Sequence, residues 1–259
     1  MLSVINVSIV NIALPEMAAD FGVDVPAIGW VFTGFLVTQA TLLAVAGRAG
    51  DVYGRRRVFV AGIAILVTGS VLCALAWSAP ALVAFRILQG TGACAMAPTA
   101  FSYAAELFAP HERGIAMGVM GGVIGLAPVL ALNLAGGLVA AFGWRSVFWF
   151  TPVVGAAVLA GAALVLEESR RPGAGQRFDL PGAGLAAAGL FAILLGLSRG
   201  GAWGWTGPAT LVALAVGLVA LGAFLAHERR AETPMLDLGL LRLRSLATAN
   251  MASMASAAA

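Results

Sequence analysis

The sequence predicts an all-α, polytopic bundle of transmembrane helices, and three observations lead to this prediction. Hydrophobic residues make up 61% of the chain and charged residues only 10%, whereas soluble domains carry about 25% charged residues. The apolar runs are about 20 residues long without period-2 alternation, so they fit helices rather than the strands of a membrane barrel. Backbone groups in hydrocarbon must also be satisfied locally, which again favours helices.

Charged breaks between the apolar runs divide the chain into successive spans. We predict spans at residues 1–15, 30–47, 58–77, 81–104, 114–140, 145–166, 180–198 and 208–226, and the start of a ninth near residue 245. We expect residues 1–166 to form a six-helix half, 167–244 to hold two linking spans and their loops, and 245–259 to begin a second half. Because 14 residues of helix reach only about 21 Å, we expect the first span, like the ninth, to be incomplete.

The placement of arginine and tryptophan predicts the topology. All fifteen basic residues are arginines, which with abundant alanine is typical of a GC-rich bacterial genome. Twelve fall in alternate breaks on one side, namely Arg48, Arg55, Arg56, Arg57, Arg113, Arg170, Arg171, Arg177, Arg229, Arg230, Arg242 and Arg244. Only Arg145 and Arg199 fall on the other side, where Trp30, Trp77 and Trp144 also lie. The Arg-rich loops are therefore predicted to be cytoplasmic, in the inner membrane of a bacterial cell.

Composition and spacing argue against several functions. The net charge of +3 is scattered in short clusters, which does not fit a nucleic-acid-binding face. Cys73 and Cys94 lie inside apolar runs without a ligand partner at metal spacing, so we interpret both as small core residues. His111 and His227 lie at loop edges, outside any catalytic cluster. The sequence thus predicts no enzyme, no cofactor and no metal site, and its first partner is the lipid bilayer.

An internal similarity links two loops on opposite sides of the predicted membrane. A shift of 89 residues superposes Tyr53 on Phe142, Gly54 on Gly143 and Arg56 on Arg145. Because three spans separate the two loops, an inverted repeat of three plus three helices would produce this pattern, which is typical of transporters. Chance similarity between glycine- and arginine-containing loops is the alternative.

The loop after the second span carries a polar motif made of Gly47, Asp51, Gly54, Arg55 and Arg56. Glycine permits a tight turn, aspartate can cap a helix start, and the arginines can bind carboxylates or phosphates. An Arg-rich topogenic loop with a turn is the simpler interpretation. The spacing G-x-x-x-D-x-x-G-R-R resembles the cytoplasmic loop signature of the major facilitator superfamily, although Val52 replaces the usual arginine. The resemblance implies a latch that steadies the outward-facing state.

The fourth span contains Arg86, Gln89 and Gly90 about 8 Å below the outer surface, by helix rise. An arginine there is unfavourable unless it faces the bundle or water, and snorkelling to the interface is an alternative. This segment resembles the R-x-x-Q-G motif of the same superfamily. The resemblance implies a role for the arginine in proton coupling, through tuning of a nearby carboxylate.

The first span carries a motif with Asn6, Asn11 and Pro15. Residues 8–15 resemble the T-I-V-N-V-A-L-P segment of the fourteen-span drug:proton antiporter family, which also inserts two extra helices between its halves. That family often carries a proton-binding aspartate five residues before the motif asparagine, where this chain has Asn6. No other acidic residue lies deep in a predicted span; Glu106 lies at the inner end of the fourth. The resemblance therefore leaves proton coupling open.

The fifth span contains small residues at helical spacing. Gly118, Gly122 and Gly125 lie on or beside one face, which predicts close helix packing, with hinge motion as an alternative. The antiporter signature expects a Gly-Pro pair in this span, which this chain lacks. Pro128, one turn earlier, could bend the helix instead.

Taken together, these features predict a proton-coupled transporter that exports drugs or other lipophilic or cationic small molecules by alternating access. The alternative is a uniporter or exporter of a specific metabolite without proton antiport, which Asn6 motivates. We also expect this chain alone to be inactive, because such transporters bind substrate between two halves. A membrane enzyme would need an acid, histidine or metal cluster at one interface, and the sequence offers none.

Overall fold

Helices form wherever the sequence offers long apolar runs, and the computed structural model confirms the predicted helical bundle. The structure describes residues 2–166, 178–231, 234–235, 248 and 251. Within these residues the elements are α1 (Leu2–Phe21), α2 (Val25–Ile28), α3 (Trp30–Tyr53), α4 (Arg55–Ala74), α5 (Ala79–Ala93), α6 (Met96–Leu107), α7 (Arg113–Phe142), α8 (Ser146–Val165), α9 (Leu180–Trp203) and α10 (Pro208–Glu228). The predicted ninth span lies outside the described residues, apart from 248 and 251.

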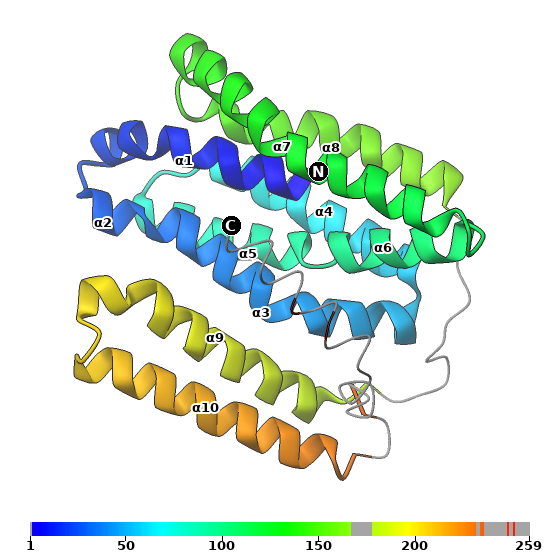
Figure 1. The fold of residues 1–259 in the computed structure, drawn as a ribbon. Coiled ribbons are helices and arrows are strands. Elements are labelled where there is room, and N and C mark those ends of the chain that lie inside the picture. The colour runs from blue at the N-terminus through cyan, green and yellow to red at the C-terminus, as the bar shows by residue number, and fades with distance from the viewer. Residues whose placement is uncertain (1, 167–177, 232–233, 236–247, 249–250, 252–259) are drawn as a thin grey trace.

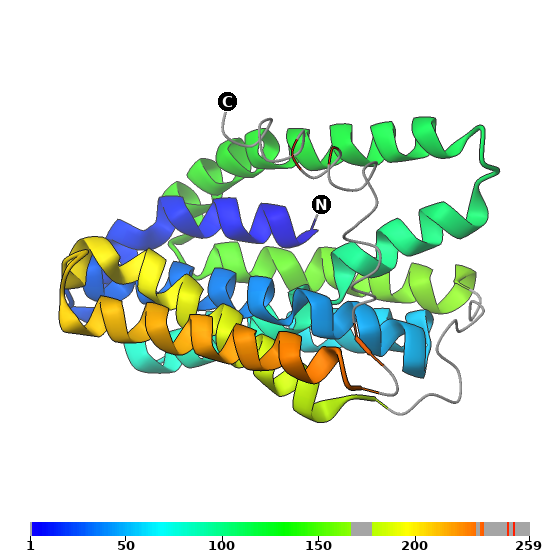
Figure 2. The same ribbon diagram turned by 60° about the horizontal axis from the view of Figure 1, so that its bottom comes forward.

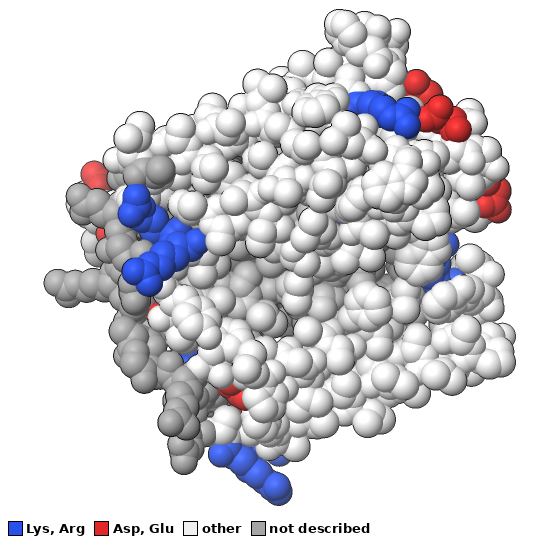
Figure 3. Space-filling view, turned by 180° about the vertical axis from the view of Figure 1, so that it is seen from behind, with Lys and Arg blue, Asp and Glu red and all other residues white. Residues whose placement is uncertain are grey.

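Among the described residues, six helical segments are long and apolar enough to cross a membrane: α1, α2 joined to α3, α4, α7, α9 and α10. Helix α8 holds a shorter apolar stretch, Ser146–Ala162. Successive crossings run in alternating directions (Figure 1), so the turns after α3 and α6 lie at one end and those after α4 and α7 at the other. Charged side chains gather at these two ends, and a broad uncharged band separates them (Figure 3), as a lipid-facing surface requires.

The first helix extends beyond the predicted span. The prediction ended span 1 at Pro15, but α1 continues through this proline to Phe21. Proline removes one backbone hydrogen bond from a helix interior and crowds the preceding turn. Here the buried side chains on both sides of it, Ala13 and Met17, are each 0% exposed and belong to the same core as residues of α7 and α8. This packing holds the helix together across the proline.

The predicted span 81–104 is divided into two helices. Helix α5 ends at Ala93 and α6 begins at Met96, with a turn at Cys94 and Ala95. Pro98 has no N–H to donate to the carbonyl of Cys94, and its ring crowds that carbonyl. The predicted span is therefore built from two consecutive helices, for a reason visible in the sequence.

Helices α4 and α5 pack with their backbones in direct contact. A Cβ atom on Gly92 would lie 2.5 Å from the carbonyl oxygen of Gly62 and 2.5 Å from the backbone nitrogen of Leu66. A Cβ atom on Gly69 would lie 3.0 Å from the Cα of Gln89. Glycine at these positions is thus a steric requirement, and it brings α5 with its polar side chains deep into the bundle.

Among the described residues, no neighbour packs against the three glycines of α7 that were predicted to form a packing face. In the part of the chain that the structure describes, a Cβ atom on Gly118, Gly122 or Gly125 would meet nothing within 4 Å. Helix α7 instead buries alanines of its second half in the core that it shares with α1, namely Ala127, Ala131 and Ala135. The helix is unbroken at Pro128 and bends along its length (Figure 2). The hinge role remains a prediction.

The last two helices form a hairpin beside the bundle (Figures 1 and 2). Helix α9 packs on both α10 and α3. At the end where α9 turns into α10, the Arg199 guanidinium lies 3.7 Å from the centroid of the Trp30 ring. At the other end, Asp179 caps α9 by accepting a 3.0 Å bond from the Gly182 amide, and its carboxylate lies 2.9 Å from Nε2 of His227. These contacts close the hairpin and attach it to α3.

Substitution of Gly92 by alanine should destabilise the protein, because the new methyl group would overlap the backbone of α4. Overpacking of this kind costs about 1–3 kcal/mol, so the unfolding midpoint of the detergent-purified chain should fall clearly in a thermal melt. Gly122→Ala is the matched control: it also adds one methyl group to a helical glycine, but into open space, so its midpoint should be unchanged or slightly higher. Equal losses in both variants would contradict the packing described above.

Candidate functional site

An arginine is fully buried in the centre of the bundle. Arg86 of α5 is 0% exposed, and so is Gln89 one turn later. The snorkelling alternative is therefore wrong, because the guanidinium turns into the protein rather than toward the interface. Such a position is unfavourable for a cation unless neighbouring groups replace its water shell.

Groups from three helices coordinate the guanidinium. Its Nε donates a 3.0 Å bond to the carbonyl oxygen of Val31 in α3. Its Nη1 donates to Oδ1 of Asn6 in α1 and, at 2.5 Å, to Oε1 of Gln89 in α5 itself. Asn6 in turn donates a 2.8 Å bond to the hydroxyl of Thr151 in α8, so a fourth helix joins the network.

Two aromatic rings complete the surroundings of Arg86. The guanidinium carbon lies 4.2 Å from the centroid of the Phe35 ring and 5.8 Å from that of Phe148, distances at which a cation is attracted to an aromatic face. Gly90 makes the first contact possible, since a Cβ atom there would lie 2.8 Å from the carbonyl oxygen of Phe35. The three residues of the predicted motif therefore lie together. Arg86 and Gln89 belong to the hydrogen-bonded network, and Gly90 is the site where α5 approaches α3 closely.

Asn6 is the member of the span 1 motif that reaches this network. Its side chain is buried, whereas Asn11 and Pro15 are exposed in the described bundle. The structure thus brings Asn6 and Arg86 into contact across 80 residues of sequence. The sequence did not indicate Thr151 or Val31, because a hydroxyl in an apolar run and a backbone carbonyl carry no recognisable pattern.

The predicted latch motif forms ion pairs at the Arg-rich end. Gly54 adopts φ of 105° between α3 and α4, which favours glycine. Arg55 begins α4, lies 3.1 Å from Asp51 at the end of α3, and also pairs with Glu106 at the end of α6. Gly47 makes only an ordinary contact, because a Cβ atom there would lie 3.7 Å from Pro98.

The partner Glu106 was not predicted as part of the latch, although the sequence placed it at the same inner end. Arg55 contacts both carboxylates. The pairs are partly exposed, with 14% of the Arg55 side chain and 34% of the Glu106 side chain accessible. Exposed pairs of this kind stabilise by about 1 kcal/mol or less. The structure thus provides a weak, breakable tie between three helices, and the latch role stays a prediction.

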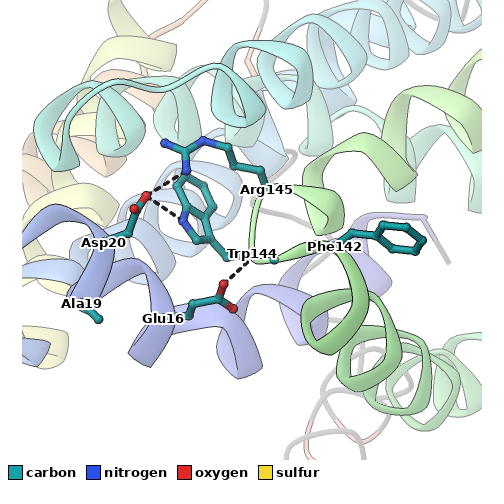
Figure 4. A pocket seen from close by; sticks show the side chains of 7 residues that line it. Glu16, Ala19, Asp20, Phe142, Trp144 and Arg145 are labelled. Atoms are coloured by element: carbon teal, nitrogen blue, oxygen red, sulfur yellow. Dashed lines mark hydrogen bonds and ion pairs between the residues drawn. The ribbon is translucent and has the colours of Figure 1, made fainter.

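A second polar cluster lies at the opposite end, between α1 and the turn before α8 (Figure 4). Asp20 accepts a 3.0 Å bond from the indole Nε1 of Trp144 and a 2.8 Å bond from Arg145. Arg145 also stacks 4.2 Å from the Trp144 ring centroid and donates to the carbonyl of Ala76, just beyond the end of α4. Glu16 accepts from the Trp144 amide at 3.3 Å. Glu16, Asp20, Trp144 and Arg145 border a shallow cavity of about 400 Å³.

The two clusters support the internal repeat. Gly54 and Gly143, which the shift of 89 residues superposes, both adopt positive φ, at 105° and 73°. Each glycine precedes an arginine that pairs with an aspartate near the end of an earlier helix. The arginines in these two pairs are Arg55 and Arg145. The shift of 89 residues superposes Arg56 on Arg145, so the structural correspondence differs from the sequence superposition by one residue.

A helical bundle of alternating crossings, with related arginine turns at its two ends and a buried arginine between them, has the architecture of a multi-pass membrane protein. Comparison with known proteins identifies the family. Residues 1–182 match the Major Facilitator Superfamily. The chain belongs to this superfamily, as its loop and span 4 motifs predicted, and it is a multi-pass membrane protein.

Three bacterial relatives illustrate the similarity. The chain is 37% identical to a probable actinorhodin transporter of Streptomyces coelicolor, over 93% of this chain and 43% of the relative. It is 35% identical to a multidrug resistance protein B homolog of Mycobacterium tuberculosis, over 95% and 46%. It is 37% identical to a cephamycin export protein of Amycolatopsis lactamdurans, over 99% and 54%. The chain spans about half the length of the curated relatives that it matches.

Arg86→Lys should destabilise the protein although it keeps the charge. A lysine ammonium is a compact point charge and cannot reach the Val31 carbonyl, Asn6 and Gln89 at once while stacking on Phe35. We expect the thermal midpoint to fall by several degrees, since loss of buried hydrogen bonds costs about 1–3 kcal/mol. Arg229→Lys, at the exposed end of α10, is the matched control. A midpoint for Arg86→Lys within error of that control would refute the coordinated role.

Neutralising Glu106 should loosen the inner end of α6. In Glu106→Gln the ion pair with Arg55 becomes a weaker neutral contact, and amide hydrogen exchange in residues 103–107 should rise about two- to fivefold, as a loss of up to about 1 kcal/mol implies. Glu112→Gln serves as the control, because Glu112 lies at the same end and its nearest histidine nitrogen is 3.9 Å away. Similar exchange in both variants would argue against the tie.

Proposed function

We propose that this protein exports lipophilic small molecules across the bacterial cell membrane by alternating access, with its Arg-rich end in the cytoplasm. The observation that carries the proposal is the similarity, over 93–99% of the chain, to relatives named as transporters or export proteins. The arginine asymmetry between the two ends supports the orientation. We further propose that residues 1–166 form one six-helix half, that α9 and α10 belong to a linking segment at 167–244, and that 245–259 start a second half.

An apolar groove offers a surface for such compounds. It has a volume of about 340 Å³ and is lined by Ser3, Phe59, Met96, Phe101, Met120 and Val158, among others. Methionine side chains adapt to ligands of different shape. Phe35 does not line the groove, because it is fully buried against Arg86.

The polar clusters at the two ends fit alternating access. Movement of the first three-helix repeat against the second at the inner end requires separation of α6 from α3 and α4, which the Arg55 pairs join. Opening of the outer end requires separation of α1 from the α7–α8 turn, which the Asp20 cluster joins. Each tie is weak enough to break during a transport cycle. In this scheme the first tie belongs to the outward-facing state and the second to the inward-facing state.

The placement of the carboxylates bears on whether such export is coupled to protons. A membrane proton carrier needs a titrating group within the bundle, and the described carboxylates lie at the helix ends, as Glu16, Asp20, Asp51, Glu106 and Asp179 illustrate. At the position where the related antiporters often carry aspartate, Asn6 accepts a hydrogen bond from Arg86 instead. This observation favours the second candidate function, export or uniport of a specific compound without proton antiport.

Export is tested in a bacterial strain that lacks its own drug exporters. The longest product of the same gene is produced there, with the 259-residue chain, which we expect to be inactive alone, as the control, and accumulation of lipophilic dyes and antibiotics is measured by fluorescence and radiolabel. Cells with the protein should accumulate less of at least one compound, and removal of the membrane potential and pH gradient should abolish the difference if the transport is energised. Unchanged accumulation at confirmed membrane levels would overturn the export proposal.

The two candidates differ in their response to Asn6→Asp. If transport runs without proton antiport, the exchange creates no flux that depends on a pH gradient in inside-out vesicles, because no proton pathway exists for the new carboxylate to complete. If the protein is an antiporter impaired only at this position, the carboxylate should raise gradient-driven flux severalfold. Asn11→Asp, on the exposed side of the same helix, controls for the added charge.

A further inference from the structure

Two hydrogen-bond donors in the buried network have no acceptor within the described residues. They are Nη2 of Arg86 and Nε2 of Gln89, and both side chains are 0% exposed. The neighbouring donors are used: Nε and Nη1 of Arg86 donate to protein oxygens, and the Asn6 amide nitrogen donates to Thr151. A buried donor without an acceptor costs about 1–3 kcal/mol, so two in one network indicate that a partner is missing.

The same site has an uncompensated positive charge. The oxygens that accept from Arg86 belong to the Val31 carbonyl and to the side-chain amides of Asn6 and Gln89, and all three are neutral. In the part of the chain that the structure describes, no carboxylate forms an ion pair with Arg86. A buried cation without a counter-ion is among the least favourable arrangements in a protein. The missing partner is thus expected to be an anion rather than a neutral acceptor.

We propose that Arg86 and Gln89 form a binding site for a single carboxylate group, supplied by a small apolar or aromatic acid. A carboxylate offers two oxygens in a plane, which match a guanidinium donor and a neighbouring amide donor. Its single charge balances Arg86 without the excess that a sulfate or doubly ionised phosphate would bring. The Phe35 and Phe148 rings beside the guanidinium leave an apolar flank for the rest of the molecule.

The site is closed in this conformation and adjoins the apolar groove. Ser3, which lines the groove, lies one helical turn from Asn6 on α1. Met96, another lining residue, packs against the cluster that contains Phe35. Movement of Met96 and Phe35 would therefore join the groove to the two donors. This inference rests on the proposed export function and deepens it, because it names apolar monocarboxylates, rather than organic cations, as the class of compound carried.

The experiment measures binding without transport, so that it is independent of the export test. Benzoate is titrated into the detergent-purified chain in sodium sulfate of matched ionic strength, and binding is followed by thermal midpoint and by isothermal calorimetry. We expect a saturable rise of the midpoint with benzoate. Arg86→Gln should abolish it. Because removal of the guanidinium also breaks the network that joins four helices, a second variant carries the test.

Asn6→Asp is the decisive variant, because it supplies the missing carboxylate within the protein. The new charge can neutralise Arg86, and the apparent affinity for benzoate should fall about tenfold or more, since the site is already neutral. Asn11→Asp adds the same charge to an exposed position of the same helix and should bind benzoate like the unmodified chain.

Three other outcomes contradict the inference. A chain that does not respond to benzoate has its donors satisfied by water, and the site does not exist. Saturation by chloride with no response to benzoate identifies an inorganic anion site and overturns the carboxylate assignment. Equal losses of affinity in Asn6→Asp and Asn11→Asp indicate general charge repulsion. Benzoate binding that depends on Arg86 in a protein that exports nothing would retain the site and reject the export function.

Discussion

A guanidinium group surrounded by apolar helices can persist only if protein atoms take the place of its water shell. In this chain that condition applies to Arg86, and its coordination draws together α1, α3, α5 and, through Asn6 and Thr151, α8. The glycines of α4, α5 and α3 follow from the same constraint, because they let backbones approach closely enough for the side chain to reach all of its partners. Much of the packing of the first eight helices can be understood as the surroundings that this one residue requires.

The ends of the bundle are organised by weaker interactions of one kind. At each end a glycine with positive φ turns the chain, and an arginine beyond it pairs with the carboxylate of an earlier helix. Both pairs are partly exposed, so neither adds much to stability. With strong coordination in the middle and weak ties at the ends, the two three-helix repeats of the proposed half can move against each other at their ends more easily than at their centre.

The sequence was sufficient to predict the fold class, the alternating crossings and the positions of two motifs, the loop around Arg55 and the segment around Arg86. Long apolar runs leave helices as the only solution in lipid, and the free-energy cost of an arginine inside such a run is enough to single out Arg86. The sequence did not reveal partners that carry no pattern, such as the Val31 carbonyl and Thr151. The α7 glycines show the opposite error, because small residues at helical spacing indicate where a neighbour could pack and cannot show that the described chain provides one.

A transporter can use a buried arginine for proton coupling or for recognition of an acidic compound. Asn6 disfavours the first use and favours the second. A carboxylate at this position would neutralise Arg86 internally and could exchange protons, whereas the amide provides one acceptor oxygen and no charge. The chain thereby loses a titrating group and retains two unsatisfied donors, Arg86 Nη2 and Gln89 Nε2. An arginine freed from an internal counter-ion can take its counter-ion from outside. The same substitution that weakens the case for proton antiport thus strengthens the case for recognition of an acidic compound.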